Sequence, residues 1–154
     1  MTTHTKRWQK VEQAKNDHIK LFGLLMRKHE YLLHKICHKY GIYRGQHHIL
    51  MALEEAPGLT QNELAAKINV AKASITTSLN RMERNGFVIR KKSTADGRCN
   101  LIYITEKGIA ASHGCDEEIN QLKEALFSKI DQQELSQVNE ILSKLLAGLE
   151  TLEE

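Results

Sequence analysis

The chain has 154 residues, of which 27% are charged, 41% hydrophobic and 5% aromatic. This length and composition are those of one globular domain, so we expect residues 1–154 to form a single domain rather than a disordered chain. No segment approaches the roughly 18 apolar residues of a membrane span, so we expect no membrane partner, and the single proline favours helix over sheet.

The formal net charge of +3 is distributed unevenly along the chain. Residues 1–43 carry nine Lys and Arg against three Asp and Glu, residues 44–108 carry ten against six, and residues 109–154 carry three against ten. A basic body with an acidic end indicates an anionic partner such as nucleic acid, and an ordinary solvated surface is the alternative interpretation.

The cysteines and the first residues predict the compartment. Cys37, Cys99 and Cys115 have no paired spacing, which is typical of proteins in a reducing environment. The opening sequence MTTHTKRWQK has no apolar stretch of the kind found in secretory signal peptides. We therefore expect a cytoplasmic protein.

A long helix is predicted first, over residues 8–40. This segment has no proline and one glycine, and its apolar residues recur at helical spacing: Leu21, Leu25, Leu32 and Ile36. Gly41 follows as a typical C-terminal stop.

A second helix is predicted over residues 45–55, with an apolar face of Ile49, Leu50 and Leu53. Pro57-Gly58 then breaks the chain. Thr60, followed by Glu63 three residues later, forms a capping box that starts another short helix.

A further helix over residues 71–85 presents Ile75, Leu79 and Met82 on one face, and Gly86 ends it. Residues 87–92 and 100–104 then alternate between apolar and polar side chains around an Asp-Gly turn. Two short alternating segments around such a turn predict a β-hairpin.

The C-terminal third is predicted to be helical again, with a heptad seam in its last helix. A single small domain cannot cover this apolar seam, so we expect it to form a dimer interface made by Leu135, Val138, Leu142, Leu145 and Leu149.

The order of these elements predicts a mainly α-helical fold with a small β-hairpin, of the winged helix-turn-helix type. We expect residues 44–108 to form the DNA-binding part, flanked by dimerisation helices at residues 6–40 and 109–154. The helix over residues 71–85 has the width that fits the B-DNA major groove. Its polar residues are the predicted contacts to bases and phosphates: Lys72, Ser74, Thr76, Thr77, Asn80, Arg81 and Arg84.

The hairpin is strongly basic, which is the property expected of a wing that meets DNA. Its predicted DNA-binding residues are Arg90, Lys91, Lys92, Asp96 and Arg98. An arginine at the tip of a wing suits a narrow minor groove, and Asp96 would orient the guanidinium of Arg98. A surface ion pair of little energetic value is the alternative for these two residues.

Three segments resemble the MarR family of transcription regulators. Residues 74–90, SITTSLNRMERNGFVIR, are similar to its recognition helix and strand entry, and residues 96–108, DGRCNLIYITEKG, to its wing. The segment TQNELA at residues 60–65 also fits. The resemblance implies that the terminal regions form a dimer interface and that Asp96 and Arg98 act in the wing. Thr77 and Asn80 stand where many members have Arg and Asp, so a family ion pair is expected to be missing.

Three classes of effector stay open. Zinc is one, with His48, His113 and Glu117 as candidate ligands, since the zinc-sensing branch of the family is similar in using such positions; surface histidines are the alternative. Thiol oxidation at Cys37 is another, with a small buried hydrophobe as the alternative. The third is a small organic ligand, as the resemblance implies. No cofactor is expected with certainty.

These observations predict a sequence-specific regulator that binds double-stranded DNA as a homodimer on a pseudo-palindromic operator, most simply as a ligand-responsive repressor. The alternative is a winged-helix adaptor that binds another protein without sequence-specific DNA binding. We do not expect an enzyme, because the sequence contains no glycine-rich phosphate loop, no GxSxG and no HExxH motif.

Overall fold

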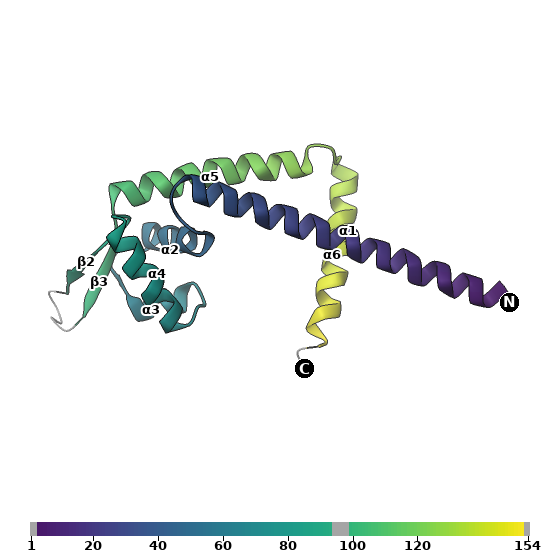
Figure 1. Cartoon of the computed structure of the whole chain (residues 1–154), viewed down its shortest axis with the longest axis horizontal. Helices are drawn as coiled ribbons and strands as arrows, with labels where there is room; N and C mark the ends of the chain where they lie inside the picture. Colours follow the sequence, from purple (N-terminus) through teal and green to yellow (C-terminus); the bar gives the residue numbers. More distant parts are fainter. Residues whose placement is uncertain (1–2, 94–98, 153–154) are drawn as a thin grey trace. The chain divides into compact units, whose positions relative to one another are not determined.

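The computed structural model describes residues 3–93 and 99–152, with side chains from residue 16 onward. The elements in chain order are α1 (Thr3–Lys39), α2 (Arg44–Glu55), β1 (Leu59–Thr60), α3 (Gln61–Lys67), α4 (Lys72–Arg84), β2 (Val88–Lys92), β3 (Asn100–Ile104), α5 (Glu106–Phe127) and α6 (Gln132–Glu150) (Figure 1). The chain divides into two compact units, Met1–Ile119 and Asn120–Glu154, so α5 begins in the first and ends in the second. The predicted fold class, mainly helical with a small sheet, is confirmed.

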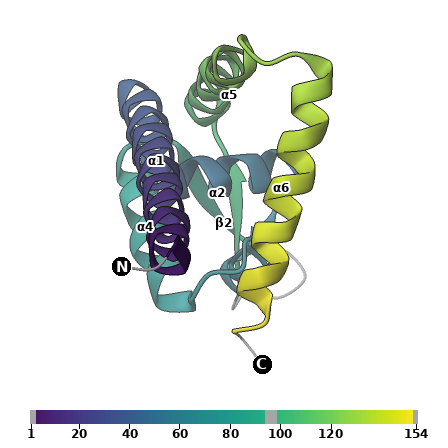
Figure 2. The ribbon, with the colours of Figure 1, turned by 90° about the vertical axis from the view of Figure 1, so that its right-hand side faces the viewer.

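The first unit is built around α2, which contacts α1, α3, α4 and β3 (Figure 2). The predicted apolar faces are buried: Ile49, Leu50 and Leu53 in α2, and Ile75, Leu79 and Met82 in α4. Burying one such aliphatic side chain stabilises the fold by about 1.5–3 kcal/mol. This free energy is gained only when the apolar faces of α2 and α4 are turned inward, so the spacing of the apolar residues determines which faces are buried.

The sheet has three antiparallel strands in the order β1-β3-β2. The predicted hairpin is present, with Val88 opposite Ile104 and Lys92 opposite Asn100. The sequence-based expectation of two strands was incomplete, because Leu59 in β1 pairs with Ile102 on the other edge of β3. Two residues are too few to show alternation, so β1 can be recognised only from its partner strand.

The predicted helix starts and stops are confirmed at the positions that fix the turns. Thr60 Oγ1 accepts from the Glu63 N–H at 3.3 Å, and Glu63 Oε2 accepts from the Thr60 N–H at 2.8 Å, which completes the capping box of α3. Gly41 and Gly86 have φ of +73° and +76°, which glycine adopts without steric cost at helix ends. Asn69 (φ +52°) supplies the same left-handed conformation between α3 and α4.

The start of α5 packs closely against the rest of the first unit. At Gly114 a Cβ atom would lie 2.2 Å from the Tyr40 ring, so only glycine lets the end of α1 approach this helix. Glu118 then accepts hydrogen bonds from Lys39 Nζ at 2.5 Å and Tyr40 Oη at 2.7 Å. These hydrogen bonds hold the pKa of the Glu118 carboxyl below its ordinary value.

The second unit contains the end of α5 and all of α6. Asp131 caps α6, since its Oδ1 accepts from the Glu134 N–H at 2.8 Å. The heptad leucines of α6 lie along one face of the helix: Leu135 and Val138 are half-buried, and Leu142, Leu145 and Leu149 are exposed. None of the described helices is both long and apolar enough to cross a lipid bilayer.

Candidate nucleic-acid interface

Helix α4, which packs on α3, has one polar face that is exposed to solvent. With Ile75, Leu79 and Met82 turned inward, the 100° step of the helix places four exposed residues on the opposite side: Ala73, Thr77, Asn80 and Arg84. Two more exposed residues, Ser74 and Arg81, lie on one flank of this face. The predicted recognition surface is thus an exposed surface of α4.

Thr76 differs from the other predicted base-reading residues because its hydroxyl bonds to a side chain of α3. Its Oγ1 donates to the Lys72 carbonyl at 2.8 Å and also accepts from Gln61 Nε2 in α3. Thr76 is half-buried beside α3. Its role in this structure is to join the two helices of the helix-turn-helix.

Arg81 is held by Tyr43, the N-cap residue that precedes α2. Arg81 Nη2 donates to Tyr43 Oη at 2.8 Å, and the guanidinium carbon lies 4.2 Å from the centroid of the Tyr43 ring. The His34 ring of α1 meets the same tyrosine edge-on, with centroids 6.3 Å apart. A cation held over an aromatic ring keeps its charge while losing conformational freedom. Tyr43 was not singled out from the sequence, because no local pattern links residues this far apart.

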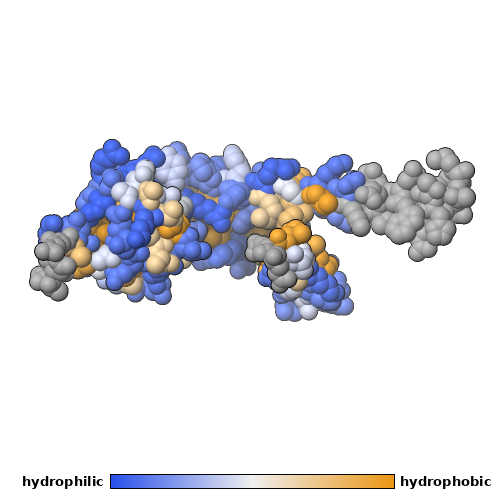
Figure 3. Space-filling view, turned by 90° about the horizontal axis from the view of Figure 1, so that it is seen from below, coloured by the Kyte–Doolittle hydropathy of each residue, from blue (hydrophilic) through white to orange (hydrophobic). Residues whose placement is uncertain are grey.

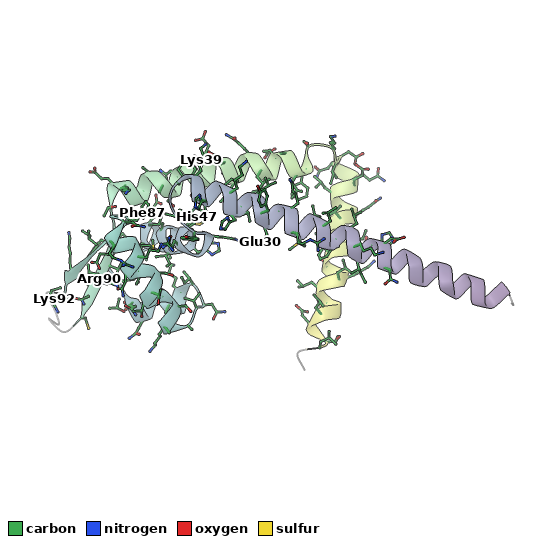
Figure 4. All side chains as sticks on the ribbon, viewed as in Figure 1. Glu30, Lys39, His47, Phe87, Arg90 and Lys92 are labelled. Carbon is green, nitrogen blue, oxygen red and sulfur yellow. The ribbon has the colours of Figure 1, made fainter. Side chains whose placement is uncertain are left out.

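Arg90 is turned toward α4 and not toward solvent (Figure 4). It forms an ion pair with Glu83, and its Nη2 donates to Asn80 Oδ1 at 2.8 Å. Only 20% of its side chain is exposed. We expected Arg90 to bind DNA directly, but this geometry assigns its guanidinium to the contact between β2 and α4. The basic character of residues 90–92 in the sequence could not predict this contact, because the partner Glu83 lies on α4 and not on the same strand.

Among the wing residues that the structure describes, Lys91 and Lys92 on β2 are exposed cations. Lys91 Nζ lies 5.2 Å from the centroid of the Tyr103 ring on β3, and Lys92 lies at the last position of the strand (Figure 4). Lys72 at the start of α4 and Arg84 in its last turn are exposed as well. Asp96 and Arg98 lie outside the described residues.

The three candidate zinc ligands do not form a metal centre. His113 Nε2 lies 2.5 Å from Glu54 Oε1, whereas His48 and Glu117 are exposed on α2 and α5. Among the residues that the structure describes, no three His, Cys, Asp or Glu side chains come together in a way that would hold a metal ion. His48, His113 and Glu117 were candidate ligands of one zinc ion, but His113 instead pairs with the Glu54 carboxylate, as the alternative of a hydrogen-bonded surface histidine implies.

Cys37 is fully buried, beside Cys115 of α5. Burial raises the pKa of the Cys37 thiol above its ordinary value, and it raises the pKa of Cys115 to about 12. The thiolate is the reactive form of cysteine, so this environment disfavours the oxidation that we considered for Cys37. The alternative interpretation, a small buried hydrophobe, describes its position.

Both units expose large apolar side chains (Figure 3). On α6 the exposed members of the predicted dimer interface are Leu142, Leu145 and Leu149. In the part of α1 whose side chains are described, from residue 16 onward, the large exposed apolar residues are Ile19, Leu21, Phe22, Leu24, Leu25, Met26 and Tyr31. Leu21 and Leu25 belong to the helical repeat seen in the sequence, while the buried residues of α1 include Leu33 and Cys37, which lie nearer its C-terminal end.

Comparison with known proteins gives the same fold. Residues 42–100 match the MarR family model. The homoprotocatechuate degradative operon repressor of Escherichia coli is 26% identical over 112 residues, which are 73% of this chain and 76% of that protein. The crystal structure of the YusO protein from Bacillus subtilis is similar with a TM-score of 0.75 at 20% identity, over 88% of this chain and 96% of that chain. A mutant of E. coli MarR in complex with operator DNA is similar with a TM-score of 0.65 at 25% identity, over 82% and 91% of the two chains.

Proposed function

We propose that the chain is a transcription regulator of the MarR family that binds double-stranded DNA sequence-specifically as a homodimer; the match of residues 42–100 to the MarR family model supports the family assignment. The observation that carries the proposal is the exposed polar face of α4, braced by α3 and tied to the basic strand β2 through Arg90. The complex of E. coli MarR with operator DNA supports the same use of this fold.

The physical argument starts from dimensions. An α-helix with its side chains is about 10–12 Å wide and enters the major groove of B-DNA, which is about 12 Å wide. Lys91 and Lys92 beside it would neutralise phosphates, which strengthens binding without reading sequence. One such helix reads only a few base pairs, so two copies about 34 Å apart on a pseudo-palindrome would multiply the discrimination.

We propose repression as the outcome of binding, since the curated E. coli relative is named as an operon repressor. The signal that releases it is proposed to be a small organic ligand. The candidate zinc ligands do not converge among the described residues, and the thiols of Cys37 and Cys115 are buried. An unchanged DNA affinity upon addition of zinc, of a chelator or of hydrogen peroxide is the expected result, and a large change with any of them would identify that effector instead.

The test is the selection of duplexes from a random pool by the full-length protein at physiological salt, followed by affinity measurements at several salt concentrations. We expect recovery of a pseudo-palindrome and an affinity that falls steeply with salt. Lys92→Gln should lower the slope of log affinity against log salt by about one, because one phosphate contact is lost. Lys144→Gln removes the same charge from α6 and should leave the slope unchanged.

An adaptor that binds only other proteins predicts a different result. The pool would stay unenriched, and neither lysine substitution would change a salt-sensitive affinity. That outcome, obtained with protein whose helical content and thermal unfolding are normal, would overturn the proposal.

A further inference from the structure

The orientation of one amide in the recognition helix is fixed by a neighbour. Asn80 lies on the outward face of α4, next to the buried Leu79, and its side chain is exposed. Its Oδ1 accepts a hydrogen bond from Arg90 Nη2 at 2.8 Å. The other end of the amide, Nδ2, meets no acceptor among the residues that the structure describes.

The chemistry of Arg90 decides which end of the amide it contacts. A guanidinium has five N–H donors and no acceptor, so it can bond only to the oxygen of an asparagine amide. Glu83 accepts from Nη1 of the same guanidinium, which holds it in place from a second direction. The rigid fork of arginine meets both partners at once, and a lysine ammonium cannot reproduce that geometry.

This arrangement limits what Asn80 can offer to a base. An unconstrained asparagine typically pairs with adenine through two hydrogen bonds, one accepted by Oδ1 and one donated by Nδ2. Here Oδ1 is directed at β2, so the amide presents its NH2 group, which only donates, to the outside. In the major groove, guanine offers the acceptors O6 and N7, adenine offers N7, thymine offers O4, and cytosine presents only its N4 donor.

We infer that Asn80 determines specificity as a donor of one hydrogen bond to a base edge, and that Arg90 is the positioning residue that fixes this polarity. The inference rests on the proposed DNA binding through α4. It assigns Asn80 a base acceptor, on guanine, adenine or thymine, and excludes cytosine at one position of each half-site. Arg90 acts through Asn80 and contacts no base.

The experiment measures base preference at every position of the selected duplex for the wild-type protein and for Asn80→Asp. Aspartate keeps the contact with Arg90 and replaces the outward donor with an acceptor. Carboxylates accept from cytosine N4, so we expect the preference at one position per half-site to move to cytosine by about tenfold while the other positions stay unchanged. Asn85→Asp adds the same charge at the C-terminal cap of α4 and should change no base preference.

Arg90→Lys tests the positioning role. Lysine keeps the charge beside Glu83 but leaves the amide free to rotate, so adenine should become at least as well bound as guanine at the same position. An unchanged preference in this variant would show that Arg90 does not fix the amide. If Asn80→Asp does not fold, judged by circular dichroism, then Asn80→Ala should abolish the discrimination against cytosine at that position.

The two levels of failure can be told apart. If the wild-type protein selects no sequence at all, the proposed function is wrong. If it selects a pseudo-palindrome and a folded Asn80→Asp variant keeps the wild-type preference at every position, only the role given to Asn80 is overturned.

Discussion

At the scale of single residues, the packing of α5 depends on two positions that carry no side chain. A Cβ atom at Gly108 would lie 2.3 Å from the Phe87 carbonyl oxygen, and one at Gly114 would lie 2.2 Å from the Tyr40 ring. Both distances are far below a van der Waals contact. The helix therefore approaches the strand entry and the end of α1 only because these residues are glycines.

We expect Gly114→Ala to destabilise the fold by about 1–3 kcal/mol, the usual cost of inserting a methyl group into a packed contact. The free energy of unfolding in urea measures this directly. Gly45→Ala is the matched control, because a Cβ atom there meets nothing within 4 Å. Equal stability of Gly114→Ala and the wild type would mean that α5 and Tyr40 are not in contact in solution.

A second expectation concerns the thiols. Burial raises the pKa of both Cys37 and Cys115, so the thiolate form is scarce and shielded in the folded protein. In the native protein at pH 8, we expect these two thiols to react with a disulfide reagent far more slowly than in denaturant. Mass spectrometry of the labelled peptides separates them from Cys99. Fast labelling of Cys37 in the native state would restore thiol oxidation as a candidate signal.

Residue identity alone predicted most of the candidate interface but not its internal contacts. The exposed positions Ser74, Thr77 and Asn80 follow from helical periodicity, which is a local property. The roles of Thr76 and Arg90 do not, since each depends on a partner from another element, Gln61 in one case and Glu83 in the other. Sequence-based reasoning assigned both to DNA because both are polar and lie near the expected contact surface.

At the scale of elements, α2 and the start of α5 meet through histidine and carboxylate pairs. His47 in α2 is almost fully buried, and its Nε2 lies 3.2 Å from Asp116 Oδ1 in α5. Glu54 in α2 pairs with His113 in α5. Burial disfavours the charged imidazole and lowers the pKa of His47, and this effect outweighs the opposing attraction of Asp116.

This environment gives the stability a pH dependence of known sign. In the unfolded chain the imidazole takes up a proton as the pH falls through about 6.5, whereas in the fold it stays neutral until lower pH. The unfolded state therefore binds more protons in that window. We expect the free energy of unfolding to fall as the pH is lowered from 7 toward 5, measured by urea titration. His47→Gln should reduce this dependence and His48→Gln should not; an equal reduction in both would place its origin elsewhere.

The elements themselves differ in how far the sequence predicts them. Helices α2 and α4 carry apolar residues at regular spacing and are followed by Pro57-Gly58 and by Gly86, so their buried faces are confirmed, and their bounds are confirmed to within one residue. Strand β1 has only Leu59 and Thr60 and exists because β3 offers a free edge. Asp131 and Glu134 form a capping box at the start of α6. This spacing of Asp and Glu makes the start of α6 predictable from local sequence alone.

At the scale of the whole molecule, the main feature is apolar surface that the chain does not cover. On α6, Leu145 and Leu149 are 54% and 61% exposed, and on α1, Leu21 is 66% exposed. Exposed apolar surface arranged in a continuous row is typical of an interface with another protein. In the proposed homodimer a second copy of the chain covers this surface. The dimer would also link two recognition helices, so that both half-sites of the DNA are bound together.

We expect the double substitution Leu145→Glu and Leu149→Glu to convert the dimer to a monomer, measured by light scattering after gel filtration. Because the two recognition helices would no longer be linked, DNA affinity should fall by about a hundredfold. Ala147→Glu adds a charge on the opposite side of α6 and should leave both properties unchanged. A double variant that stays dimeric would mean that these leucines lie outside the interface.

The contact between Gly114 and Tyr40 also constrains how this sequence can change over evolutionary time. A larger residue at position 114 becomes acceptable only once the ring at position 40 is gone, and losing that ring also removes one of the two donors that Glu118 accepts from. Lys39 would then be its remaining partner. Positions 39, 40, 114 and 118 should therefore drift as one linked set among descendants of this protein, with glycine at 114 retained wherever tyrosine persists at 40.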